Sequence, residues 1–212
     1  MPFSWQFKES DSYEWRNFGP SDNVAIEKLY CDVEKLEINM VLKDTSSREL
    51  NVSSTLITAN FEDMSMTLQT SAQFLLRRLS TPSYIKEPGN VLSTKWIWYW
   101  QDDDGWKKYA VTKKSSETKQ EDIEAAYLKE DQSYFFQIGT FNYIITFYET
   151  SMYQTNMDPR YFTKRSVRRR PLFASESVLQ TTHSELKGQD MDFERIALKR
   201  GREMLAVSKR FS

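Results

Sequence analysis

Cysteine, glycine and proline are scarce in this chain of 212 residues, and each scarcity excludes a class of protein. A single cysteine, Cys31, excludes an intrachain disulfide and a cysteine zinc cluster, and is typical of a reducing compartment. Six glycines and six prolines are too few for a low-complexity chain, so we expect most of it to fold. No apolar run approaches the roughly 18 residues of a membrane-spanning helix, and the N-terminus lacks a secretory pattern. The sequence therefore predicts a soluble cytoplasmic protein with no membrane partner, and it leaves a nuclear pool open.

Signals for catalysis and for metal binding are scarce as well. The one histidine, His183, lies in a polar stretch near the C-terminus, and no Gly-rich phosphate loop or Ser/His/Asp order is visible. Three aspartates, 102–104, precede Gly105, which is more typical of a turn than of a metal site. A formal net charge of −1 argues against polyanion binding through overall charge, although a local basic patch remains open. We therefore predict no enzyme activity, no cofactor and no metal.

Aromatic residues, by contrast, make up 14% of the chain, and their order repeats. Each copy has three alternating aromatics, two further aromatics, a helix-like segment, a Met-containing strand and a basic ending. In the first copy these are Phe3, Trp5, Phe7, Trp15, Phe18, 26–30, 61–66 and Arg77-Arg78. In the second they are Trp96, Trp98, Trp100, Trp106, Tyr109, 123–127, 147–154 and 164–170. Because the order agrees throughout, we predict a tandem duplication.

The spacing of apolar residues predicts an α+β plan for each copy. Alternation over 3–7 and 96–100 is a strand pattern, and residues 102–105 predict the turn of a hairpin. Short helices are expected over 24–30 and 120–129, and further strands over 36–42, 56–61, 134–138 and 141–148. The chain is divided into a first domain over 1–82, a linker over 83–93, a second domain over 94–171 and a C-terminal linker or tail helix over 172–212.

The second copy resembles the WWE domain, which is named for two tryptophans and a glutamate. Trp98, Trp106 and Glu124 stand in those places, and Tyr109 fits the aromatic that follows the second tryptophan. Further matches are Tyr143, Ile145, Phe147, 152–156 and the basic ending 164–171. The tandem arrangement looks like the central region of the CCCH zinc-finger members of the poly(ADP-ribose) polymerase family. The resemblance implies two WWE domains, each a strongly curved antiparallel half-barrel sheet packed on one short helix.

The resemblance also implies a ligand, the ADP-ribose unit of poly(ADP-ribose). Such a ligand needs an aromatic face for adenine, hydrogen-bonding groups for ribose and a cation for the diphosphate. By resemblance, Trp100 and Tyr143 line the adenine and ribose pocket, and Gln154 contacts the ligand. Arg165 stands near the phosphate-binding arginine, and Tyr109 closes the pocket edge. We expect Trp98 and Trp106 to be packing residues and Glu124 to be structural.

The first copy differs at these positions. Phe7 replaces Trp100, Met66 replaces Gln154, and Ile57 or a neighbour replaces Tyr143, whereas Arg77 is aligned with Arg165. We therefore expect the first copy to keep a cation, lose the polar groups and act as a scaffold.

Two alternative functions stay open at this point. The chain could be a protein-interaction scaffold that binds no nucleotide, with protein partners unknown. It could also bind RNA through its basic strand and exposed aromatics, or through adjacent zinc fingers that lie outside this chain.

Overall fold

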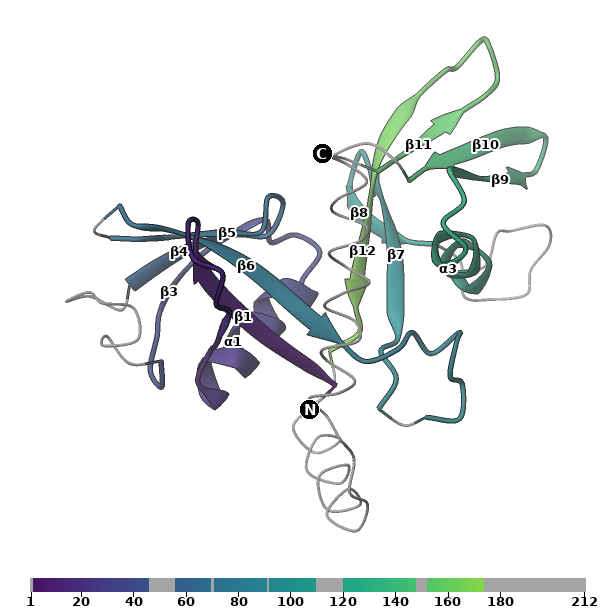
Figure 1. The fold of residues 1–212 in the computed structure, drawn as a ribbon. Coiled ribbons are helices and arrows are strands. Elements are labelled where there is room, and N and C mark those ends of the chain that lie inside the picture. The colour runs from purple at the N-terminus through teal and green to yellow at the C-terminus, as the bar shows by residue number, and fades with distance from the viewer. Residues whose placement is uncertain are drawn as a thin grey trace. The chain divides into compact units, whose positions relative to one another are not determined.

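A computed structural model describes residues 2–45, 56–69, 71–90, 92–109, 120–147 and 152–173. The prediction of a linker or helix beyond residue 173, and His183 with it, lies outside the described residues. The chain forms two compact units (Figure 1), the first from residues up to 82 with 89–94, and the second from 83–88 with 95–172. The segment predicted as a linker is thus divided between the two units. Among the described helices, none has the length and apolar character needed to cross a membrane.

The two units have the same order of elements. The first contains β1 (Phe3–Glu9), β2 (Arg16–Asn17), α1 (Pro20–Cys31), β3 (Glu37–Val41), β4 (Leu56–Asn60), β5 (Ser65–Leu68) and β6 (Gln73–Ser80). The second contains β7 (Trp96–Asp102), β8 (Gly105–Lys108), α3 (Gln120–Leu128), β9 (Ser133–Ile138), β10 (Phe141–Thr146), β11 (Tyr153–Asn156) and β12 (Lys164–Pro171). The predicted hairpin is β7–β8. Helix α1 begins earlier than predicted because Pro20 suits a first helical turn.

Each unit is one six-stranded antiparallel sheet with the same strand order. The first sheet runs β2-β1-β6-β5-β4-β3 and the second β8-β7-β12-β11-β10-β9. In both, the last strand returns to pair with the first strand beside its hairpin partner (Figure 1). The α+β prediction of two half-barrel units is confirmed.

One buried tryptophan anchors the helix to the sheet in each unit. In the first unit, the indole N–H of Trp5 donates to Glu27 at 2.9 Å, and Arg78 donates to the same carboxylate at 2.6 and 2.8 Å. Both Trp5 and Glu27 are almost completely buried. A buried ion pair needs such complete hydrogen bonding, because each desolvated charge costs several kcal/mol.

The second unit repeats this anchor. The indole N–H of Trp98 donates to Glu124 at 3.0 Å, and Arg169 donates to that carboxylate at 2.6 and 2.8 Å. The hydroxyl of Ser83 adds a further hydrogen bond at 2.8 Å. Burial alone would raise the pKa of Glu124, but Arg169 and the other donors outweigh it and hold this pKa below its usual value. The predictions that Trp98 packs in the core and that Glu124 is structural are confirmed.

Trp106 does not belong to this core, so its predicted packing role is wrong. The β7–β8 turn pairs Gln101 with Trp106, which places Trp106 on the face of the sheet opposite to Trp98. There it is half-buried, and the guanidinium of Arg168 lies 4.1 Å from its ring.

Candidate ligand-binding site

The inner face of the second sheet is the face that carries Trp98 and contacts α3. Residues directly opposite each other in an antiparallel pair lie on the same face. Arg169 pairs with Trp98, and Gln154 pairs with both Arg165 and Ile145. Two-residue steps along the strands then add further residues to this face. All four strand residues of the predicted site lie on it: Trp100, Tyr143, Gln154 and Arg165.

A buried hydrogen-bonded pair lies at the centre of the inner face. The hydroxyl of Tyr109 donates to the side-chain oxygen of Gln154 at 2.8 Å, and these residues are 4% and 7% exposed. Tyr109 is directed there because its backbone N–H donates to the carbonyl of Trp98 at 3.1 Å. Burial raises the pKa of Tyr109, so its hydroxyl keeps its proton. With the oxygen of Gln154 engaged by Tyr109, its amide N–H groups are the part that can donate to a ligand.

Stacked rings connect this pair to Tyr143. The ring of Phe136 lies 5.4 Å from that of Tyr143, nearly parallel to it, and 6.0 Å from that of Tyr109. Phe136 lies opposite Tyr143 in the β9–β10 pair. It was not among the predicted site residues, although its place in the alternating strand predicted over 134–138 could have indicated it. Stacked rings of this kind fix the orientation of Tyr143.

Arg165 lies near Trp100 and is paired with an acidic turn. Its guanidinium is 5.5 Å from the Trp100 ring, and its Nη1 lies 2.9 Å from Asp102 and 3.2 Å from Asp103. Asp102 ends β7 and Asp103 lies in the two-residue turn before β8, within the segment predicted as a turn. The described residues hold no group of three or more His, Cys, Asp or Glu side chains suited to a metal ion. Arg165, which the sequence predicts to bind a ligand phosphate, is thus paired with two carboxylates in this structure.

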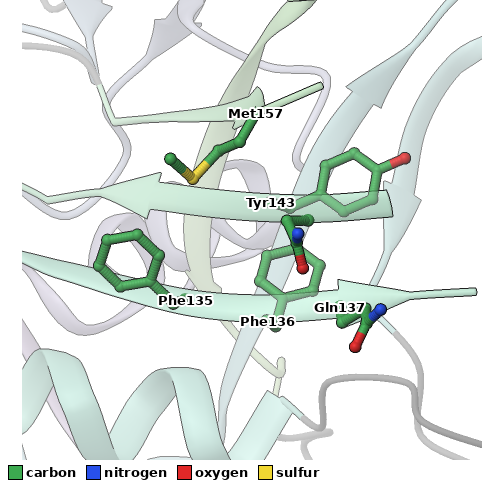
Figure 2. Close-up of a pocket in the computed structure, with 6 residues that line it drawn as sticks. Phe135, Phe136, Gln137, Tyr143 and Met157 are labelled. Carbon is green, nitrogen blue, oxygen red and sulfur yellow. The ribbon is translucent and has the colours of Figure 1, made fainter. Parts of the chain in front are cut away.

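An open hollow lies along the β9–β10 hairpin, beside Met157. It has a volume of about 560 Å³ and is lined by Phe135, Phe136, Gln137, Asn142, Tyr143 and Met157 (Figure 2). Of the predicted site residues, only Tyr143 lines it. The hollow is therefore a rival location for a ligand, lined by residues from both faces of the β9–β10 hairpin.

The first unit has apolar residues at every equivalent position. The strand pairs Met66–Phe74 and Gln154–Arg165 correspond, as do the identical hydrogen bonds from Phe18 to Trp5 and from Tyr109 to Trp98. The counterparts of Trp100, Tyr109, Tyr143, Gln154 and Arg165 are Phe7, Phe18, Ile57, Met66 and Phe74, and all five are buried in one core.

This correspondence overturns the alignment of Arg77 with Arg165. Arg78 occupies the place of Arg169, so Arg77 corresponds to Arg168. The connection from β11 to β12 is longer than that from β5 to β6, so counting from Met66 gives the wrong partner. The first unit therefore lacks a cation at this position.

Residues 96–169, which make up most of the second unit, match the model of the WWE domain family. Most of the chain is also similar to parts of two longer proteins. It is 32% identical over 191 residues to zinc finger CCCH-type antiviral protein 1 of Rattus norvegicus, covering 85% of this chain and 20% of that protein. It is 31% identical over 209 residues to protein mono-ADP-ribosyltransferase PARP12 of Homo sapiens, covering 89% of this chain and 26% of that protein. The chain thus spans 20% and 26% of the length of these two relatives.

Proposed function

We propose that the second unit is a non-catalytic module that binds ADP-ribose units of poly(ADP-ribose). The observation that carries this proposal is the buried Tyr109–Gln154 pair on a face where the first unit has Phe18 and Met66. A buried polar pair is costly unless it is satisfied, and an apolar core would be at least as stable there. The match of residues 96–169 to the WWE family and the similarity to an antiviral protein and a mono-ADP-ribosyltransferase support the same ligand class.

The roles follow from the chemistry of each side chain. Trp100 and Tyr143 offer aromatic surface to adenine and ribose, and Gln154 donates to a ligand oxygen. Arg165 meets the diphosphate, in competition with Asp102 and Asp103. One aromatic site with a few charge-assisted bonds is expected to bind with micromolar affinity, roughly 7–9 kcal/mol.

In this proposal the first unit is a degenerate WWE copy that acts as a scaffold. Its counterpart face is filled by the side chains of Phe7, Phe18 and Met66, all buried. Such a face offers no partner for ribose hydroxyls or phosphate, and leaving those groups unpaired would cost about 1–3 kcal/mol each.

Calorimetric titration of the intact chain with ADP-ribose, ATP and short poly(ADP-ribose) tests the proposal. The variants Trp100→Ala and Gln154→Ala should each weaken ADP-ribose binding by about tenfold or more. Phe135→Ala serves as the control, because Phe135 lines the rival hollow and is 62% exposed.

Two outcomes would refute the proposal. One is an intact chain that binds none of the three ligands. The other is binding that survives in both inner-face variants, and a loss confined to Phe135→Ala would then move the site to the hollow.

A further inference from the structure

The outer face of the second sheet, opposite to the inner face, carries basic and aromatic side chains from four adjacent strands. Tyr99 pairs with Lys108 on one side and with Arg168 on the other, so these three form a row across β8, β7 and β12. The same face continues onto β11, where Thr155 pairs with Lys164 and Tyr153 with Ser166. The basic and aromatic residues of this outer face are Tyr99, Trp106, Lys108, Tyr153, Lys164 and Arg168.

Cations and rings are paired on this face. The ammonium of Lys164 lies 3.3 Å from the centre of the Tyr153 ring, and the guanidinium of Arg168 lies 4.1 Å from that of Trp106. Lys108 lies 5.9 Å from the Tyr99 ring. Lys108 and Lys164 are exposed, whereas the rings are half-buried. Each charge is therefore held in a fixed place on an aromatic support.

The first unit has neutral, non-aromatic residues at four of these positions. By the same strand pairing, Gln6 replaces Tyr99, Asn17 replaces Lys108 and Gln73 replaces Lys164. Ser65 replaces Tyr153. Only the pair of an arginine and a tryptophan is shared, as Arg77 lies 4.2 Å from the Trp15 ring. At these four positions the basic and aromatic side chains are thus specific to the second unit, although the first unit places Lys8 5.5 Å from the Trp15 ring on its own outer face.

Carboxylates are missing from the outward positions of these four strands, all of which the structure describes. The outward residues of β7, β8, β11 and β12 include no Asp or Glu. Acidic residues lie instead in the β7–β8 turn, where Asp102 and Asp103 hold Arg165.

We propose that the outer face binds single-stranded RNA without strong sequence preference. Strand spacing puts Lys108 and Arg168 about 10 Å apart and Lys164 about 13 Å along β12 from Arg168, distances that phosphates separated by an intervening nucleotide of a flexible strand can match. Bases stack on aromatic rings and on arginine planes, both of which this face provides. The assignment does not depend on the inner-face site, because the two sets of residues lie on opposite faces.

Fluorescence anisotropy with a labelled RNA of about 12 nucleotides tests this assignment, since single-strand binding modules span about 4–16 nucleotides. The double variant Lys108→Asn/Lys164→Gln installs the residues of the first unit. It should weaken RNA binding about tenfold and reduce the slope of log K against log salt by about 1.4, as expected for two lost phosphate contacts. The control Lys35→Asn/Lys129→Gln removes the same charge from exposed positions off this face and should leave RNA binding unchanged.

Calorimetry separates this site from the inner-face site. The double variant should bind ADP-ribose as the unmodified chain does, and Gln154→Met should bind RNA as the unmodified chain does. The RNA assignment is wrong if the unmodified chain binds no RNA at about 0.1 M salt, where such contacts are strong. It is equally wrong if the control variant loses as much affinity, or if the double variant loses poly(ADP-ribose) but keeps RNA. That last result would mean that the outer face binds poly(ADP-ribose) and not RNA.

Discussion

The two units share one scaffold and differ on the face that the scaffold presents. Trp5, Glu27 and Arg78 in the first unit make the same hydrogen bonds as Trp98, Glu124 and Arg169 in the second. At the positions of the candidate site, however, the first unit has only buried apolar side chains, whereas the second unit has polar groups at Tyr109, Gln154 and Arg165. The Trp–Glu–Arg anchor is therefore common to the fold of both units, whereas the inner-face residues differ and can give the two units different binding properties.

The difference between the two inner faces also indicates which residues of the second unit contribute less to its stability. Its buried apolar core is smaller than that of the first unit among the described residues, and Gln154 and Asn156 occupy positions that Met66 and Leu68 fill there. Polar groups at such positions add little to stability compared with well-packed apolar side chains. We interpret these residues as retained for binding rather than for folding.

The largest expected effect tests the shared anchor. Glu27→Gln and Glu124→Gln each leave a buried arginine without its counter-charge, which should lower the free energy of unfolding by about 3–5 kcal/mol. The loss should be greater for Glu27, because Arg78 is 4% exposed and Arg169 is 14% exposed. Urea denaturation of the two variants measures this, and losses below about 1 kcal/mol would show that the anchor is dispensable.

The same anchor predicts an acid response in the second unit. The pKa of Glu124 in the folded chain is lowered, so this group contributes stability above its unfolded pKa of about 4.3 and loses it as the pH falls through the folded value. Thermal melting at pH 7 and at about pH 3 should therefore differ more for the unmodified chain than for Glu124→Gln. An identical acid response in both chains would contradict the assignment.

A smaller effect is expected from one hydroxyl. Tyr109→Phe gives the second unit the residue of the first and removes the donor to Gln154. We expect ADP-ribose affinity to fall by about five- to tenfold, since one hydrogen bond contributes roughly 1 kcal/mol. Calorimetry measures the change, and Tyr99→Phe on the outer face is the matched control. Equal affinities for Tyr109→Phe and the unmodified chain would remove Tyr109 from the site.

The smallest expected effect concerns the acidic turn. Asp103 competes with a ligand phosphate for Arg165, so Asp103→Asn should raise ADP-ribose affinity by about two- to fourfold, in keeping with an exposed ion pair. The affinity for adenosine, which has no phosphate, should not change. Titration of both ligands checks the prediction, and weaker ADP-ribose binding would instead mean that Asp103 positions Arg165.

Much of the fold follows from local sequence, because alternation and helical spacing are properties of short segments. The strands at 96–100 and 134–138, the hairpin and the helix beginning at Gln120 were all predictable in this way. The first helix begins at Pro20, before the predicted start at residue 24, because the spacing of apolar residues does not register a proline that suits the first helical turn.

The features of the site that the sequence did not predict depend on the lengths of the connections between strands. The two-residue turn after Asp102 moves Trp106 to the outer face, and the longer β11–β12 connection moves Arg165 out of line with Arg77. The pairing of Arg165 with Asp102 and Asp103 requires two strands distant in sequence to end side by side, which no local pattern shows. The resemblance implies that Tyr109 and Gln154 belong to the site, but only the three-dimensional structure shows the hydrogen bond between them.

Exchange of the inner-face pair between units tests the central claim most directly. We would titrate ADP-ribose into the unmodified chain, into Tyr109→Phe/Gln154→Met, and into Phe18→Tyr/Met66→Gln, which places the polar pair in the first unit. The account predicts one bound ADP-ribose per unmodified chain, no measurable binding to the first variant, and one to the second variant, despite some loss of stability there. Undiminished binding to Tyr109→Phe/Gln154→Met would contradict it.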